Sequence, residues 1–181
     1  FIFYTLFIFY TFFFHIYNIV YFMGGGILPY TIYRNRIYFL FSRECKESMN
    51  DPGKWSDFGG GKEKKETPLE TAIREGFEES EGFLGDKDEI KKLIENESTK
   101  KIQTSNYTSY IIYIPYDKEL PKKFRSNFLN IKKNYPEKIN KNGRYEKDML
   151  KWINIKKIPE LYDTFRPWYK QILLNIINLD L

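Results

Sequence analysis

The sequence has almost no cysteine or histidine. Cys45 is its only cysteine and His15 its only histidine among 181 residues. A single cysteine excludes an intrachain disulfide and a cysteine-based zinc site, and it fits a reducing compartment, so we expect a cytoplasmic protein. Beyond the N-terminal segment, any catalytic base or metal ligand must come from carboxylates, backbone carbonyls, lysine or tyrosine. Oxygen ligands of this kind favour hard cations such as Mg²⁺ or Mn²⁺.

Charge is absent from the first 22 residues. This segment is more than half aromatic and about as long as a bilayer-spanning helix. However, no basic residue precedes it, and Leu, Val and Ala are scarce. Because Met23 follows at once, residues 1–22 have three interpretations: translated sequence upstream of the natural start, a membrane anchor, or a buried extension. Residues 23–181 are the expected globular domain.

The rest of the chain is basic. It holds all 29 Lys and Arg against 24 Asp and Glu, a net charge of +5. A basic balance favours anionic partners such as nucleotides, inositol phosphates, RNA or an acidic membrane face. The alternative is codon bias, because abundant Lys, Asn, Ile, Tyr and Phe are typical of AT-rich coding sequence.

Hydrophobic patterning predicts one α/β domain, since 42% hydrophobic residues suffice for a single core. The expected strands are 27–33, 37–42, 107–116 and 149–155, with a hairpin turn at 34–36. Helices are expected after Thr67, at 124–135 and at 164–177. Thr67-Pro68-Leu69-Glu70 has the pattern of a capping box, with Thr67 as the N-cap. Strands interrupted by helices, without an internal repeat, indicate a mixed α/β fold.

The helix after Thr67 has an apolar face and an acidic face. At about 100° per residue, Glu75, Glu78 and Glu79 gather on one side. The opposite stripe is apolar and consists of Leu69, Ala72, Ile73, Gly76 and Phe77. Like-charged helical neighbours repel one another, and a divalent cation would offset that repulsion. The alternative is a solvated acidic face on an amphipathic helix.

A spaced pattern of charged residues and glycine surrounds this helix. Gly60, five residues, Glu66, seven residues and then Arg74-Glu75-Gly76-Phe77-Glu78-Glu79 resemble the Nudix box, G-x5-E-x7-R-E-U-x-E-E-x-G-U, where U is a bulky aliphatic residue. There are three departures. Gly76 replaces the aliphatic residue, Lys65 stands where a glycine often precedes the glutamate, and the ending Ser80-Glu81-Gly82-Phe83 is one residue longer. The longer ending leaves the carboxylate spacing intact and predicts a helix stop at Gly82.

The resemblance to the Nudix family implies an α/β/α sandwich with a mixed sheet, and it makes 23–181 a Nudix hydrolase domain. It implies hydrolysis of the diphosphate linkage in a nucleoside diphosphate linked to a further group. The implied ligands of Mg²⁺ or Mn²⁺ are the Gly59 carbonyl, Glu75, Glu78 and Glu79. The implied catalytic residues are Glu75, Glu79 and Glu146, with Glu75 the first choice of base and Glu146 its rival. Arg74 and Glu66 are expected to orient the ligands.

The substrate is less clearly indicated. Lys122, Lys123 and Arg125, followed by two further lysines, form a basic stretch that could follow a polyphosphate or RNA backbone, or could be a solvated face. Candidate substrates are dinucleoside polyphosphates, nucleoside triphosphates, nucleotide sugars, the mRNA cap and diphosphoinositol phosphates. The AT-rich style suggests a eukaryotic parasite or a large virus, which makes mRNA decapping the leading specific alternative. A non-catalytic nucleotide- or RNA-binding Nudix module is the alternative from another class. Dimers are common in the family, so a homodimer is also an expectation.

Overall fold

The computed structural model describes residues 24–179, and one mixed sheet organises them. This range contains seven strands. Five of them neighbour one another in the order β3-β2-β1-β6-β5, while β4 pairs with β1 and β7 pairs with β2. The strands are β1 (Gly24–Tyr33), β2 (Arg36–Glu44), β3 (Trp55–Ser56), β4 (Phe58–Gly61), β5 (Lys100–Gln103), β6 (Tyr107–Tyr113) and β7 (Lys147–Asn154). Strands β1 and β6 run parallel, and the other named pairs are antiparallel.

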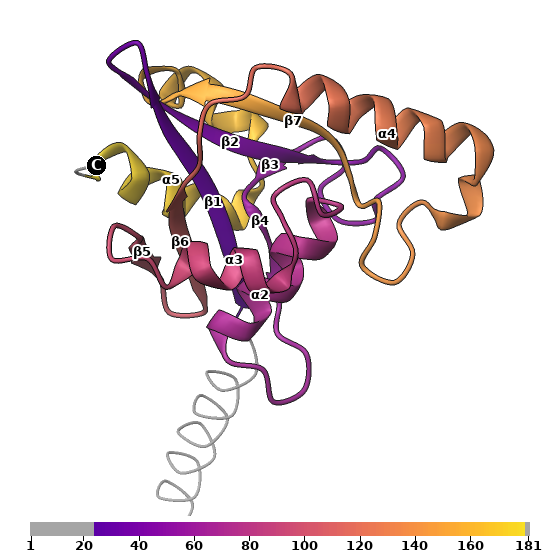
Figure 1. Cartoon of the computed structure of the whole chain (residues 1–181), viewed down its shortest axis with the longest axis horizontal. Coiled ribbons are helices and arrows are strands. Elements are labelled where there is room, and N and C mark those ends of the chain that lie inside the picture. Colours follow the sequence, from indigo (N-terminus) through magenta and orange to yellow (C-terminus); the bar gives the residue numbers. More distant parts are fainter. Residues whose placement is uncertain (1–23, 180–181) are drawn as a thin grey trace, which may run out of the picture.

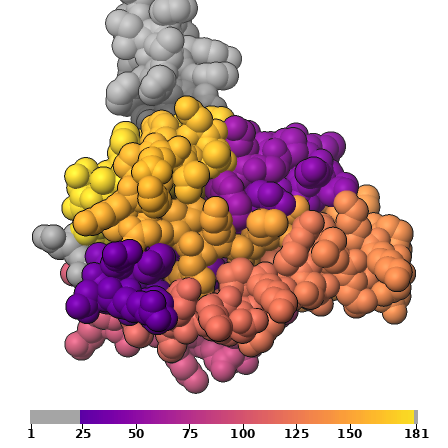
Figure 2. All heavy atoms as spheres, turned by 90° about the horizontal axis from the view of Figure 1, so that it is seen from above, coloured from indigo at the N-terminus to yellow at the C-terminus, as the bar shows by residue number. Residues whose placement is uncertain are grey.

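Helices cover both faces of the sheet (Figure 1). They are α2 (Pro68–Glu79), α3 (Lys87–Ile94), α4 (Leu120–Asn134) and α5 (Lys170–Ile177). Helices α2, α3 and α4 share one apolar core with Ile27 and Leu40, whereas α5 shares the other with Leu28 and Phe39. Figure 2 shows the salmon-to-orange segment that contains α4 along an outer edge of the molecule. This arrangement confirms the α/β/α sandwich with a mixed sheet.

Glycine determines how the centre of the sheet is built. Strand β1 begins three residues earlier than predicted, because Gly24–Gly26 pair with Gly61–Gly59 of β4. A Cβ on Gly25 would lie 2.0 Å from the carbonyl oxygen of Pro68, so the glycine lets the start of α2 lie directly on β1. The three glycines after Phe58, for which no strand was predicted, therefore belong to a strand.

Several elements differ from the predicted ones. Helix α3, which has its own Asp86–Glu89 capping box, and strand β5 were not predicted. The final helix was predicted at 164–177, but α5 begins only at Lys170. Its first half is replaced by the 3₁₀ turns η3 (Pro159–Thr164) and η4 (Pro167–Tyr169). Proline disfavours the helical region for the residue before it, and Arg166 is accordingly extended.

Within residues 24–179, no helix is both long and apolar enough to cross a membrane. The uncharged segment 1–22 lies outside the described residues. Its interpretations, and the domain boundary at Met23, therefore stay predictions.

Candidate functional site

Helix α2 carries the glutamates of the candidate site, and its start and packing follow the sequence pattern. Thr67 Oγ1 accepts from the backbone N–H of Glu70, and Glu70 accepts from the backbone N–H of Thr67, which completes the predicted capping box. Gly76 faces the sheet, where an added Cβ would lie 2.7 Å from Ile27 Cδ1. The apolar stripe thus packs tightly on β1, and the acidic side faces away from it.

The helix ends earlier than the predicted stop at Gly82. Its last residue is Glu79, and the next turn is closed by two backbone bonds, from Gly82 N–H to the Phe77 carbonyl and from Glu81 N–H to the Glu78 carbonyl. This pair is the Schellman pattern, in which the residue after the C-cap is left-handed. Glu81 occupies that position with φ 53°. The longer box ending therefore places a glutamate where glycine is usual.

A buried lysine faces Glu79. Lys147, fully buried at the start of β7, contacts Glu44 and lies 3.0 Å from Glu79 Oε1. The second Glu79 oxygen accepts from the Gly59 backbone N–H at 2.7 Å. Burial disfavours the ammonium, but the charges of Glu79 and Glu44 outweigh it and raise the pKa of Lys147. Glu44 is also 2.8 Å from Arg166, so the ion pairs continue towards the C-terminal segment.

Arg74 gathers three other carboxylates. Its Nε lies 2.8 Å from Glu66 Oε1, and its Nη1 lies 2.8 Å from Glu75 Oε1 and 3.2 Å from Glu78 Oε2. Its Nη2 donates to the Gly61 carbonyl. The guanidinium lowers the pKa of Glu66 to about 2. Arg74 and Glu66 thus hold the acidic side of α2 against β4, in keeping with their predicted orienting roles.

The segment before β7 brings Glu146 to the same place. Its backbone carbonyl accepts from the Cys45 N–H at 2.7 Å, which fixes it beside the end of β2. The neighbouring Gly143 passes so close to α2 that a Cβ there would lie 2.9 Å from Glu78 Oε2. The charge of Glu146 is therefore close enough to Glu75 and Glu78 to add to their repulsion, and the catalytic role of Glu146 stays a prediction.

Negative charge exceeds positive charge in this cluster. Burial, with added repulsion from Glu78 and Glu146 and against the opposing charge of Arg74, raises the pKa of Glu75 to about 7. Burial and the charges of Glu44 and Glu78 likewise raise the pKa of Glu146. A cation bound among these groups would relieve both costs.

The donors suit Mg²⁺ or Mn²⁺ in type. They are hard carboxylate oxygens beside a glycine backbone, and a Cβ on Gly60 would lie 2.5 Å from Glu75 Oε1, so glycine provides the space that Glu75 fills. Across residues 24–179, however, no three His, Cys, Asp or Glu side chains already converge as a metal site. Arg74 holds Glu75 and Glu78, and Lys147 holds Glu79. A cation would fit this set once Arg74 gives up part of its contact with Glu75 and Glu78. The metal ligands implied by the resemblance stay a prediction.

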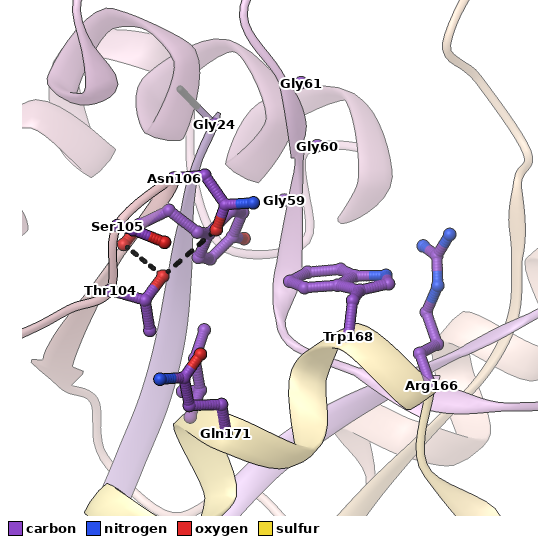
Figure 3. Close-up of a pocket in the computed structure, with 12 residues that line it drawn as sticks. Gly24, Gly59, Gly60, Gly61, Thr104, Ser105, Asn106, Arg166, Trp168 and Gln171 are labelled. Atoms are coloured by element: carbon purple, nitrogen blue, oxygen red, sulfur yellow. Dashed lines mark hydrogen bonds between the residues drawn. The ribbon is translucent and has the colours of Figure 1, made fainter. Parts of the chain in front are cut away.

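A pocket of about 440 Å³ lies beside the glutamates. Figure 3 shows Trp168 within it, between the glycine strand Gly59–Gly61 and Gln171, with Asn106 opposite. The Arg166 guanidinium lies 5.3 Å from the Trp168 ring centre. Because Gly60 borders the pocket and also contacts Glu75, strand β4 is a wall shared by the pocket and the glutamates.

The predicted basic residues of α4 lie elsewhere. None of Lys122, Lys123 and Arg125 lines this pocket. Lys123 pairs with Asp117 at 3.2 Å, and Arg125 pairs with Asp148 at 3.1 Å while donating to its backbone carbonyl. A substrate role for these three residues stays a prediction that the pocket does not support.

Sequence reasoning missed the residues that surround the glutamates from other elements. Lys147 begins a strand that also contains Asp148, Lys151 and Asn154, so nothing in the sequence marked it as a buried lysine that needs a charged partner. Glu81 was visible as the extra residue of the box. Arg166 and Trp168 were expected within the final helix, and nothing in the sequence indicated that they would lie beside the glutamates instead.

Comparisons with known proteins support the fold. No protein-family model matches the sequence. A stretch of 59 residues is 42% identical to uncharacterized protein L534 of Acanthamoeba polyphaga mimivirus, covering 32% of this chain and only 19% of that protein. Among solved structures, a C. elegans Ap4A hydrolase matches with TM-score 0.50 and 16% identity over 86% of this chain and 94% of that one. The NUDIX domain of Shewanella oneidensis NrtR, complexed with ADP ribose, matches with TM-score 0.51 and 9% identity over 87% of each chain. The shared topology shows that this chain adopts the Nudix fold.

Proposed function

We propose that this chain is a metal-dependent Nudix hydrolase that cleaves the diphosphate linkage in a nucleoside diphosphate linked to another group. The observation that carries the proposal is that Arg74 gathers Glu75 and Glu78 beside the β4 glycines of a Nudix fold, where the charge of Glu146 adds to the repulsion that raises the pKa of Glu75. An acidic face that served only for solvation would not be held inward by Arg74, nor be met by a glutamate from a distant loop.

The proposed roles follow from the contacts. Arg74 and Glu66 hold the carboxylates in place, and Glu78 with Glu75 and the Gly59 carbonyl would hold Mg²⁺ or Mn²⁺. When bound, the cation supplies positive charge that offsets diphosphate oxygens and acidifies a water molecule. Glu75 remains the first choice for proton acceptor, because its pKa of about 7 suits a base at neutral pH.

Glu146 is the rival base. It lies across the site from α2, on a segment that is independent of the helix. Glu79 is better suited to a supporting role, since Lys147 and the Gly59 N–H already engage its two oxygens.

The neighbouring pocket suits the rest of the substrate. Trp168 offers an aromatic face, Asn106 and Gln171 offer amide edges, and β4 separates them from Glu75 by a single strand. A nucleotide whose planar base stacks on Trp168 could extend its phosphates across the glycine backbone of β4 towards the glutamates. The similar C. elegans protein is an Ap4A hydrolase, and the similar Shewanella domain forms a complex with ADP ribose, so an adenine nucleotide is the first substrate to test.

The test is product analysis by mass spectrometry on the full chain with Mg²⁺ or Mn²⁺. The substrates are Ap4A, ADP ribose, nucleoside triphosphates, a nucleotide sugar, capped RNA and a diphosphoinositol phosphate. We expect cleavage that a chelator abolishes. Removing a general base typically costs about 10²-fold or more in kcat, so Glu75→Gln and Glu146→Gln should separate the two candidates.

Glu97→Gln is the matched control, because Glu97 is exposed and has no side-chain hydrogen bond or ion pair among the described contacts. It should leave kcat within about twofold. Full turnover in both active-site variants would refute the role assignment. Metal and nucleotide binding without cleavage of any substrate would instead support the non-catalytic module, and preference for capped RNA would identify a decapping enzyme.

A further inference from the structure

The extra glutamate at the end of the box reaches the segment that carries Glu146. Glu81 is left-handed, and its side chain is only 6% exposed. Its Oε1 accepts from the Tyr145 backbone N–H at 2.6 Å. Its Oε2 lies 3.9 Å from Arg144 Nε. Glu81 therefore ties the end of α2 to the residue immediately before Glu146.

The segment from Asn140 to Tyr145 needs such a tie. Asn140, Asn142 and Tyr145 all have positive φ, with values of 56°, 54° and 55°. A non-glycine residue held in this region is strained unless its surroundings stabilise it. Two contacts hold the segment against β2 and α4: Tyr145 packs against the small apolar cluster of Cys45, Phe128 and Ile139, and the Glu146 carbonyl accepts from the Cys45 N–H. Towards α2, the Arg144 guanidinium lies 5.7 Å from the Phe77 ring centre, and the bond from Tyr145 to Glu81 is the direct hydrogen bond to the end of the helix.

The position is a costly one for a carboxylate. Glu81 is mostly buried and close to the like charges of Glu78 and Glu146. A carboxylate that only ended the helix would face this repulsion without a compensating interaction. The N–H of Tyr145 gives it a charge-assisted hydrogen bond, which is stronger than a neutral one.

We propose that Glu81 is a positioning residue that fixes the 140–146 segment, so that Glu146 is held opposite Glu75 and Glu78. The inference rests on the proposed hydrolase function and adds to it a residue that the usual Nudix box does not contain. Glu81 acts through the Tyr145 amide and does not touch the reacting atoms. The one-residue-longer ending of the box thereby sets the distance between helix α2 and the segment that carries Glu146.

The experiment compares Glu81→Ala, Glu81→Gln and Glu146→Gln, and the double variant Glu81→Ala/Glu146→Gln, on the substrate found by the panel. Glu81→Ala loses the acceptor, and a misplacement of about 1 Å can cost up to about 10²-fold, so we expect kcat to fall at least tenfold with little change in KM. Glu81→Gln keeps an acceptor oxygen and should restore most of kcat. In the Glu146→Gln background, Glu81→Ala should cause no further loss.

Hydrogen exchange at the Tyr145 amide gives a readout that does not depend on activity. It should speed up in Glu81→Ala and stay slow in Glu81→Gln. If the full chain hydrolyses nothing, this exchange result still decides whether Glu81 clamps the segment, so the two proposals fail separately. The positioning role is overturned if Glu81→Gln is as impaired as Glu81→Ala, if the two losses multiply in the double variant, or if the Tyr145 amide exchanges equally in all variants.

Discussion

A buried aspartate should make the protein lose stability as pH rises. Asp57, between β3 and β4, is fully buried and accepts hydrogen bonds from Tyr107 Oη at 2.9 Å and Ser109 Oγ at 2.7 Å. Burial raises its pKa from the ordinary 3.8 to about 6, although these hydrogen bonds and the charges of Lys147 and Arg166 oppose the change. Ionised Asp57 is therefore a cost to the folded state.

The size and sign of this cost follow from linkage. A shift from 3.8 to about 6 corresponds to about 3 kcal/mol. Because the folded pKa lies above the unfolded one, the folded state holds its proton longer, and stability falls as pH rises from about 4 to about 6. Asp57→Asn removes the ionisation and keeps the shape. We expect the variant to be more stable than the parent by about 1 kcal/mol at pH 4.5 and by up to about 3 kcal/mol at pH 7.5.

Urea denaturation at pH 4.5, 6.0 and 7.5 measures this difference. Asp163→Asn is the matched control, since Asp163 is exposed and the neighbouring Lys170 lowers its pKa, so this variant should show no gain at high pH. A stability difference for Asp57→Asn that is the same at all three pH values, or a loss at pH 7.5, would refute the reasoning.

Two further substitutions test the packing around α2. Lys147→Met removes the ammonium that contacts two buried glutamates, Glu44 and Glu79. Because breaking a buried ion pair from one side typically costs about 3–5 kcal/mol, urea denaturation should show a loss of that order in the free energy of unfolding. An unchanged denaturation midpoint would contradict the pairing. Gly76→Ala gains about 1 kcal/mol of helix propensity but pushes a Cβ to 2.7 Å from Ile27, where overpacking costs about 1–3 kcal/mol. We expect a net loss for Gly76→Ala and almost no change for Gly61→Ala, which has no atom within 4 Å of its added Cβ; a more stable Gly76→Ala protein would show that the helix can move away from β1.

Local signals in the sequence were sufficient to predict the start and the orientation of helix α2. The capping box at Thr67 and Glu70 forms as predicted, because both of its bonds are made within one turn. The apolar stripe faces the sheet because helical periodicity fixes which residues share a side. The hairpin of β1 and β2 forms for the same reason, since Arg34 and Asn35 close it locally with positive φ.

Predictions that depended on a proline or on long-range pairing did less well. The helix expected from residue 164 starts at Lys170, because Pro167 forces Arg166 into an extended conformation. No strand was predicted at Gly59–Gly61, which pair with a second glycine run more than thirty residues earlier. Glycine alone favours neither a strand nor a loop, so the partner decides which one forms.

The sequence by itself determined that three glutamates would share one side of a capped helix, because box spacing and helical periodicity are local properties. The Nudix-type α/β/α sandwich was implied by the resemblance of that box to the Nudix family. The tertiary structure decided what those glutamates face. Lys147 meets Glu79, the Glu81 carboxylate binds the Tyr145 amide next to Glu146, and Trp168 lines a pocket beside β4. These partners come from strands and turns distant along the chain, and their positions depend on how the whole sheet packs, which no local pattern records.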